Sequence, residues 1–300
     1  MYSLHNELIE QKTKAVRLAV LFKKSNILAT SGVKIEHCCD TVSFCFSGDG
    51  EPQINNVFFC REKYCPTCQR RKSLKAYAEG MRLADKLADK FAFLHVVLTV
   101  RNCDGAKLRH TVQLMNTASS KLLRGALCKT AFKGVLRCLE ISVNTSENTY
   151  HPHFHCLVAV NKSYFTSRYY VRQADLSAAW AQLVGQAAAV VHISRVSDPR
   201  SALAEVCKYC TKPLDIDNCR DVLSFYEVLY MQTKGLRHVQ SFGVIREALK
   251  ELKIDFEALK VDWECESLDF TDFEDIGEIL GGGDVVYRWN IERGKYICEK

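Results

Sequence analysis

The order of apolar segments between residues 93 and 212 is the feature that most constrains the fold. Residues 93–100 are rich in β-branched side chains and predict a buried strand, and residues 106–125 carry apolar side chains at helical spacing. A hairpin, a helix, a strand and a second helix are then expected, at 134–143 with 150–160, 173–186, 190–196 and 201–212. The order β-α-β-β-α-β-α is typical of a split βαβ arrangement. We therefore predict an α+β fold of ferredoxin- or RRM-like type, a mainly antiparallel sheet with helices on one face.

The segments outside this core suggest three domains. We expect residues 1–90 to hold a cysteine-rich module and a basic helix, and residues 91–213 to form the core. Residues 214–300 read as a helical and acidic extension that ends in a hairpin.

The charge of the chain is divided unevenly. The net charge is +6, yet the residues from Ile254 onward include 13 acidic and 5 basic side chains, so the first 253 residues carry +14. A basic body with an acidic tail is common in nucleic-acid-binding proteins, because lysine and arginine neutralise phosphates. No apolar stretch approaches the roughly 20 residues of a membrane span, and the first residues lack a signal-peptide core. We therefore expect a cytoplasmic protein with no membrane partner.

Three histidines fall within residues 151–155, in the second strand of the predicted hairpin. Because strand side chains alternate between faces, His153 and His155 project to one side, and two imidazoles on one face can bind one cation. The first strand of the hairpin carries Glu140 between apolar neighbours, where a carboxylate needs a partner. Two imidazoles and a carboxylate leave positions open for water or phosphate oxygens. The alternative is a cluster of hydrogen-bonded histidines at a strand edge.

The predicted helix at 201–212 carries Glu205 and Tyr209 four residues apart, on one face. A phenol becomes a nucleophile when a cation or base favours its ionised form, so Tyr209 is a candidate to attack a phosphate near the metal. Lys208 and Lys212 lie on an adjacent face, where their charge would offset that of the phosphate. Glu205 would act as general base. Alone, the helix also fits an ordinary surface position.

The cysteines Cys60, Cys65 and Cys68 have the spacing of a zinc knuckle. We expect a fourth ligand among Cys38, Cys39, Cys45 and His37, and favour Cys38. The alternative is a redox CxxC pair. Directly after Cys68 comes a basic run, which we expect the zinc module to present to phosphates: Arg70, Arg71 and Lys72.

Taken together, these segments resemble the replication initiator (Rep) proteins of rolling-circle plasmids, within the HUH endonuclease superfamily. The resemblance rests on the cysteine-containing segment from Cys38 to Arg71, the strand at 93–100, Tyr150 to His155, and Glu205 to Lys212, with a weaker match at 237–243.

The resemblance implies a metal-dependent enzyme that nicks one DNA strand at a plasmid double-strand origin. Tyr209 would become linked to the 5′ phosphate, and Glu205 would direct a hydrolytic step at termination. The catalytic ion would be Mg²⁺ or Mn²⁺ on His153, His155 and Glu140, with structural Zn²⁺ on the cysteines. The expected partners are the origin DNA, its single-stranded nick site, and a host helicase and polymerase.

Three rival interpretations remain. A relaxase or single-strand transposase shares the chemistry, but the cysteine-rich module ahead of the core argues against both. A non-enzymatic zinc protein that binds DNA leaves the histidine pair without purpose. An iron oxygenase with two histidines and one carboxylate gives no role to Tyr209.

Overall fold

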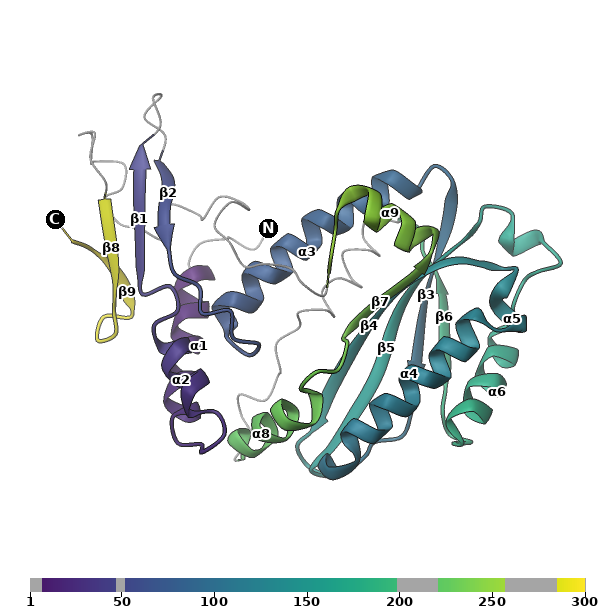
Figure 1. Ribbon diagram of the computed structural model, residues 1–300, viewed down its shortest axis with the longest axis horizontal. Coiled ribbons are helices and arrows are strands. Elements are labelled where there is room, and N and C mark those ends of the chain that lie inside the picture. The colour runs from purple at the N-terminus through teal and green to yellow at the C-terminus, as the bar shows by residue number, and fades with distance from the viewer. Residues whose placement is uncertain (1–6, 47–51, 199–220, 257–284, 300) are drawn as a thin grey trace. The chain divides into compact units, whose positions relative to one another are not determined.

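The computed structural model describes residues 7–46, 52–198, 221–256 and 285–299 (Figure 1). It divides into two compact units, one made of residues 1–72 with 260–300 and the other of residues 73–259. The domain limits at residues 90 and 213 suggested by the sequence stay a prediction.

A five-stranded sheet forms the centre of the second unit. Its strands stand in the order β6-β3-β5-β4-β7, and each neighbouring pair is antiparallel. The strands are β3 (Phe91–Thr99), β4 (Phe132–Asn144), β5 (Thr149–Asn161), β6 (Val191–Arg195) and β7 (Val239–Gly243). Because β3 to β6 follow the split βαβ order, the predicted α+β, ferredoxin-like class is confirmed. β7 extends the sheet beyond β4.

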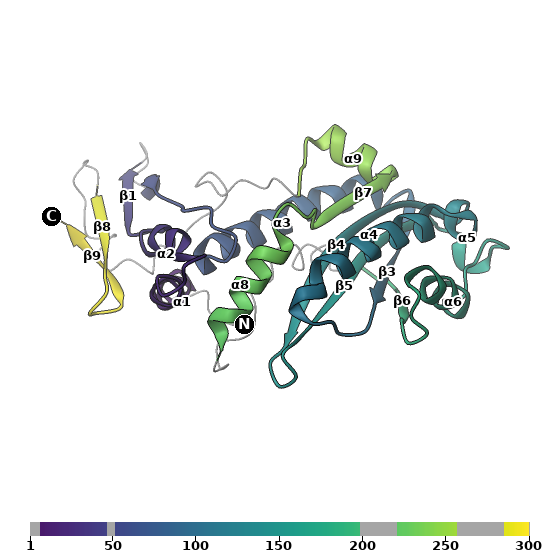
Figure 2. The same cartoon turned by 60° about the horizontal axis from the view of Figure 1, so that its bottom comes forward.

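The two crossover helices form one layer on this sheet. α4 (Leu108–Arg124) follows β3 and α6 (Gln173–Val184) follows β5, and they pack side by side (Figure 2). On β4, Arg137 faces this layer: its guanidinium donates to Asn116 Oδ1 at 2.5 Å and to Ser119 of α4. Burial lowers the pKa of Arg137 to about 10, so the side chain still carries its charge at neutral pH.

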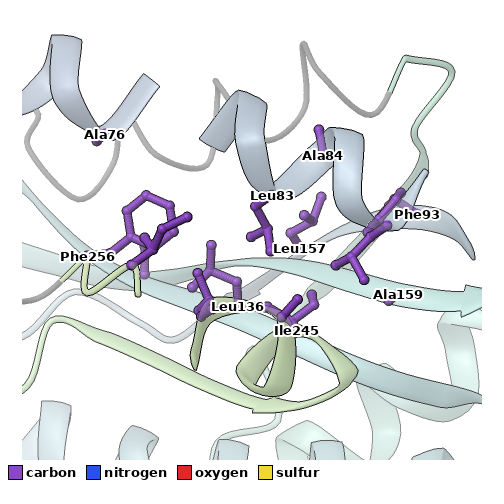
Figure 3. Close-up of a cluster of buried hydrophobic side chains, with 14 residues drawn as sticks. Ala76, Leu83, Ala84, Phe93, Leu136, Leu157, Ala159, Ile245 and Phe256 are labelled. Carbon is purple, nitrogen blue, oxygen red and sulfur yellow. The ribbon is translucent and has the colours of Figure 1, made fainter. Parts of the chain in front are cut away.

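Helices also cover the opposite face, which the sequence-based prediction of helices on one face did not include. α3 (Pro66–Leu87) and α9 (Val244–Leu252) bury their apolar side chains against β3, β4 and β5. Figure 3 shows Leu83 of α3 and Ile245 of α9 gathered with Leu136 and Leu157 of the sheet. The apolar run at 157–160 is fully buried on both faces of β5, as expected of a strand covered from both sides.

A glycine makes the close approach of β7 and β4 possible. Gly243 has φ +61°, a left-handed conformation that favours glycine, and is paired with Gly134. A Cβ at Gly243 would lie 2.1 Å from the carbonyl oxygen of Lys133. A side chain there would therefore push β7 off the sheet.

The described residues of the second unit also contain η1 (Gly105–Lys107), α5 (Ala126–Lys129), η2 (Tyr164–Thr166) and α8 (Val222–Thr233). α8 and α9 correspond to the helices expected in the C-terminal extension. In the described parts of the chain, no helix is both long and apolar enough to cross a membrane.

The first unit combines helices α1 (Glu7–Phe22) and α2 (Ala29–Glu36) with a second antiparallel sheet. This sheet has the order β2-β1-β8-β9. Its strands are β1 (Thr41–Phe46), β2 (Pro52–Val57), β8 (Val285–Asn290) and β9 (Lys295–Glu299). The expected terminal hairpin is thus present as β8 and β9, and it pairs with β1 near the other end of the chain.

A buried lysine ties α1 to the segment between α2 and β1. The ammonium of Lys12, fully buried, donates to the carbonyl oxygens of Glu36 at 2.8 Å and Cys38 at 2.7 Å and to Asp40 Oδ1 at 2.5 Å. A buried charge is tolerated only when it is paired and hydrogen-bonded, and here one amine has three acceptors.

We expect Leu83→Ala to lower the free energy of unfolding by about 2–5 kcal/mol, because Leu83 is fully buried between α3 and the sheet. Urea denaturation followed by circular dichroism measures this. The control is Tyr77→Ala, an exposed residue of the same helix, which should change stability by only about 0.5 kcal/mol. Equal effects of the two substitutions would contradict the second helical layer.

Candidate functional site

The β4–β5 hairpin brings Glu140, His153 and His155 together on one face of the sheet. In the strand register Glu140 stands opposite His153, and His155 stands opposite Cys138. Since side chains alternate along a strand, all three point to the face covered by α3 and α9. The turn that fixes this register is closed by Asn144, whose Oδ1 accepts from the backbone N–H groups of Ser146 and Glu147, both at 3.2 Å.

Pro152 fits into β5 without breaking the sheet. A proline has no N–H to donate, and β5 is an internal strand. Pairing with β3 ends at His153, opposite Thr99, so Pro152 lies one residue beyond the shared stretch. The sequence His-Pro-His-Phe-His is therefore compatible with an internal strand.

One carboxylate oxygen joins the two imidazoles. Glu140 Oε2 lies 2.6 Å from His153 Nε2 and 2.9 Å from His155 Nε2. The exposed fraction of the side chain is 9% for Glu140, 8% for His155 and 13% for His153, so the site meets solvent mainly at His153.

These three groups fit a divalent cation. Adjacent ligands of an octahedral ion with bonds of about 2.1 Å stand about 3 Å apart, close to the separations of Glu140 from both imidazoles. The three ligand atoms all lie within 4.8 Å of one another. Two histidines and one carboxylate on one side of an ion leave the other side open to a substrate.

A backbone carbonyl sets the proton position on His153. His153 Nδ1 lies 3.1 Å from the carbonyl oxygen of His151 and donates to it, which leaves Nε2 facing Glu140. This partner fixes the ring in the tautomer that a metal ligand needs. Burial, and then the neighbouring His153, lower the pKa of His151.

His95 is a residue of this site that the sequence analysis missed. It lies on β3, on the same sheet face, and its Nε2 stands 3.1 Å from His155 Nδ1. The two rings are stacked at 18° with centroids 5.4 Å apart. The available signal was a histidine within an apolar strand, two positions away from Phe93 and from Val97, which puts all three on the same face.

We expect His95→Phe to weaken Mn²⁺ binding by about 10- to 100-fold, because His155 loses the partner of its second ring nitrogen. His95→Gln keeps a hydrogen-bonding group and should recover part of that affinity. Titration of the metal-free protein by Mn²⁺ electron paramagnetic resonance measures both. Equal affinity in the wild type and the His95→Phe variant would refute a positioning role for His95.

The second cluster consists of Cys38, Cys60, Cys65 and Cys68, whose sulfurs all lie within 4.8 Å of one another. Cys68 Sγ is 3.5 Å from Cys38 Sγ and 3.7 Å from Cys60 Sγ. Four thiolates around a tetrahedral zinc with bonds of about 2.3 Å stand about 3.8 Å apart. The cluster is therefore compatible with a structural zinc module, as the fold prediction included.

The surroundings of the cluster favour thiolates. The backbone N–H of Cys60 donates to Cys38 Sγ at 3.4 Å, and that of Arg61 donates to Cys68 Sγ at 3.3 Å. Hydrogen bonds among the thiols hold the pKa of Cys65 well below its usual value and raise that of Cys38, so the thiols share their protons unevenly. A cation thus meets a partly ionised cluster.

Of the four candidates for the last ligand, Cys38 is the one that lies in the cluster. Cys39 is not part of the cluster: its backbone has a positive φ of 57°, and both of its backbone groups are hydrogen-bonded. Its N–H donates to Phe58 O at 2.7 Å, and its carbonyl accepts from the hydroxyl of Tyr296 at 2.6 Å.

We expect Cys38→Ser to lower the zinc content from one ion per chain to well below one, since three thiolates bind the ion less tightly than four. Elemental analysis after dialysis against a chelator measures this. Cys45→Ser, in β1, is the matched control and should retain its zinc. Loss of zinc from Cys39→Ser, with retention in Cys38→Ser, would contradict this ligand set.

The basic run after Cys68 is only partly available to a ligand. Arg70 and Lys72 are half-buried. Arg71 is 7% exposed, with its guanidinium 5.5 Å from the centre of the Phe59 ring. Arg71 thus offers little of its surface to a phosphate here, and its contact with DNA stays a prediction.

The predicted nucleophile helix lies outside the described residues. This applies to Glu205, Lys208, Tyr209 and Lys212, whose roles rest on the sequence alone.

Comparison with known proteins gives matches over most of the chain. The model of the family Rep_1, described as replication protein, matches residues 51–297. A Protein rep of Streptococcus pneumoniae serotype 2 (strain D39) is 31% identical over 301 residues, covering 96% of this chain and 91% of that protein. A Protein rep of Lentilactobacillus hilgardii is 28% identical, covering 92% and 88%. A Protein rep of Staphylococcus aureus is 32% identical, covering 60% and 82%. No solved structure matches.

Proposed function

Because the chain belongs to the Rep_1 family of replication proteins, we propose that it initiates plasmid rolling-circle replication by nicking one DNA strand at the origin. Family membership confirms the resemblance to Rep proteins that the motifs indicated. The finer proposal is an HUH-type endonuclease and strand transferase with Tyr209 as its nucleophile.

The convergence of Glu140, His153 and His155 carries this proposal. A carboxylate within hydrogen-bonding distance of two imidazoles, on a face that opens at His153, is a site for a divalent cation and a phosphate oxygen. Replication requires access to a 3′ hydroxyl, and a site of this kind supplies one by breaking a phosphodiester bond. The imidazole donors favour Mn²⁺ over Mg²⁺, which prefers oxygen ligands.

The reaction divides between the metal site and the tyrosine. A divalent ion, when bound, supplies a Lewis acid that polarises the phosphate. Glu140, His153 and His155 hold the site in a fixed position on the sheet. The Tyr209 hydroxyl gives up its proton and its oxygen attacks the phosphorus, the bond to the 3′ oxygen breaks, and that oxygen takes up a proton from solvent. The product is a 5′-phosphotyrosine and a free 3′ hydroxyl that primes synthesis.

A second residue of the same segment ends the cycle in this proposal. Glu205, four residues before Tyr209, takes a proton from a water molecule whose oxygen attacks the phosphorus of the 5′-phosphotyrosine; the bond to the Tyr209 oxygen breaks, and that oxygen takes up a proton. Lys208 and Lys212 offset negative charge at the phosphates, and Arg70 and Lys72 contact the DNA backbone. The chain would act in the cytoplasm on the double-strand origin and its single-stranded nick site. A host helicase and polymerase would extend the primer.

The proposal predicts a covalent adduct with a single-stranded oligonucleotide that carries the nick site of the plasmid origin, in the presence of Mn²⁺. Tyr209→Phe should form no adduct, because the attacking oxygen is missing. The double variant His153→Ala/His155→Ala should form at least about 100-fold less adduct than the wild type, since a bound ion contributes several kcal/mol of transition-state stabilisation. Denaturing gel electrophoresis with labelled DNA measures both.

Two further variants sharpen this assay. Glu205→Ala should form the adduct but release it slowly, and Tyr77→Phe, an exposed tyrosine of α3, should match the wild type. Adduct formation by Tyr209→Phe at the wild-type rate would show that another residue is the nucleophile.

A further inference from the structure

The loop between β5 and α6 (Figure 1) is rich in aromatic and basic residues. We call residues 162–172 the tyrosine loop. It contains Tyr164, Phe165, Tyr169 and Tyr170 together with basic residues, and no acidic residue. Neither the metal site nor the cysteine cluster uses any of these residues.

The tyrosine loop is held in one conformation by a buried side chain. Tyr164 is 3% exposed, and its hydroxyl bonds to both backbone groups of Val171. It accepts from the N–H at 3.1 Å and donates to the carbonyl at 3.3 Å. Ser167 makes a turn inside the loop, where its carbonyl accepts from the N–H of Tyr170 at 3.2 Å. The exposed residues are therefore presented by a closed and internally bonded loop.

Two neighbouring tyrosines face solvent on this support. The exposed fraction is 45% for Tyr169 and 51% for Tyr170, and among the described residues no other large apolar side chains that are adjacent in sequence are both this exposed. Aromatic rings are normally buried away from water. Two neighbouring rings that a closed loop holds in solvent are therefore a candidate contact surface.

Guanidinium groups accompany these rings. Arg168 donates to the Tyr169 hydroxyl at 2.7 Å, with its guanidinium 4.9 Å from the centre of that ring. On β6, exposed Arg195 lies 4.6 Å from the centre of the Phe165 ring. Lys162 is exposed as well. Of the basic residues in the loop, Arg172 is offset by an acid, through its pair with Asp175 at 2.8 Å.

We propose that the tyrosine loop is a binding surface for single-stranded DNA, on which Tyr169 and Tyr170 stack with bases while Arg168, Arg195 and Lys162 contact phosphates. Aromatic faces stack with any base, and a planar guanidinium both stacks and binds phosphate. The inference rests on the proposed function for its choice of ligand, because a nicking enzyme must hold an unpaired strand. It adds a contact surface separate from the metal ligands.

Fluorescence anisotropy of a labelled 15-nucleotide oligo-dT, which lacks a nick site, tests the surface with the full chain and EDTA present. Tyr169→Ala/Tyr170→Ala should weaken binding by about 5- to 150-fold for each base that loses its stacking partner. Tyr169→Phe/Tyr170→Phe keeps both rings and should bind within about twofold of the wild type, which separates stacking from misfolding. Tyr77→Ala is the control for an exposed tyrosine elsewhere.

A salt titration tests the phosphate contacts. Arg168→Gln should reduce the slope of log affinity against log salt concentration by about 0.7, the value for one phosphate on a single strand. Unchanged binding of oligo-dT by the double alanine variant would overturn the proposal. So would an equal loss of oligo-dT affinity in Tyr77→Ala, or a double alanine variant that loses as much affinity for double-stranded DNA as for oligo-dT.

The metal-free design keeps this test separate from the nicking assay. If oligo-dT binding falls in the double alanine variant while the wild type forms no adduct with Mn²⁺, the binding surface stands and the proposed nuclease does not. If the wild type forms the adduct and the double alanine variant binds oligo-dT as well as the wild type does, the proposed nuclease stands and the binding surface does not.

Discussion

The contact of Glu140 with two histidines depends on the antiparallel register of β4 and β5. A shift of one residue would turn His153 and His155 to the face of α4 and would leave Glu140 opposite an apolar ring. The Asn144 turn on one end and the burial of residues 157–160 on both faces at the other hold that register. The candidate metal site is therefore a property of the whole hairpin, and its geometry is fixed by a strand that cannot shift its register without exposing its buried residues.

In the first unit, interactions from distant parts of the chain meet in residues 38–40. The carbonyl of Cys38 accepts from Lys12 of α1, and the carbonyl of Cys39 accepts from Tyr296 of β9. The thiol of Cys38 belongs to the cysteine cluster. A helix, a terminal hairpin and a cluster of thiols thus contact one short segment. Loss of any one of these contacts is expected to destabilise the conformation of residues 38–40 on which the other two depend.

The sequence predicted the central fold well because its signals are local. Strand and helix periods gave the order of β3 to β6, and the alternation of His153 and His155 followed from the strand alone. The second helical layer was missed because Leu83 and Ile245 meet across about 160 residues of chain. His95 was missed for a related reason: its contact with His155 joins two strands whose pairing is visible only in the folded sheet. The burial of Arg71 likewise depends on Phe59, whose position no local pattern reveals.

The sheet of the first unit joins the two ends of the chain, since β1 lies between β2 and β8. During synthesis on the ribosome, β1 and β2 emerge long before residue 285 exists, so one edge of β1 stays unpaired while the entire second unit is made. The first unit can therefore complete its sheet only after residues 285–299 have been made. Chains that stop before residue 285 have only β1 and β2 of that sheet, so completion of the cysteine-containing unit depends on the synthesis of β8 and β9.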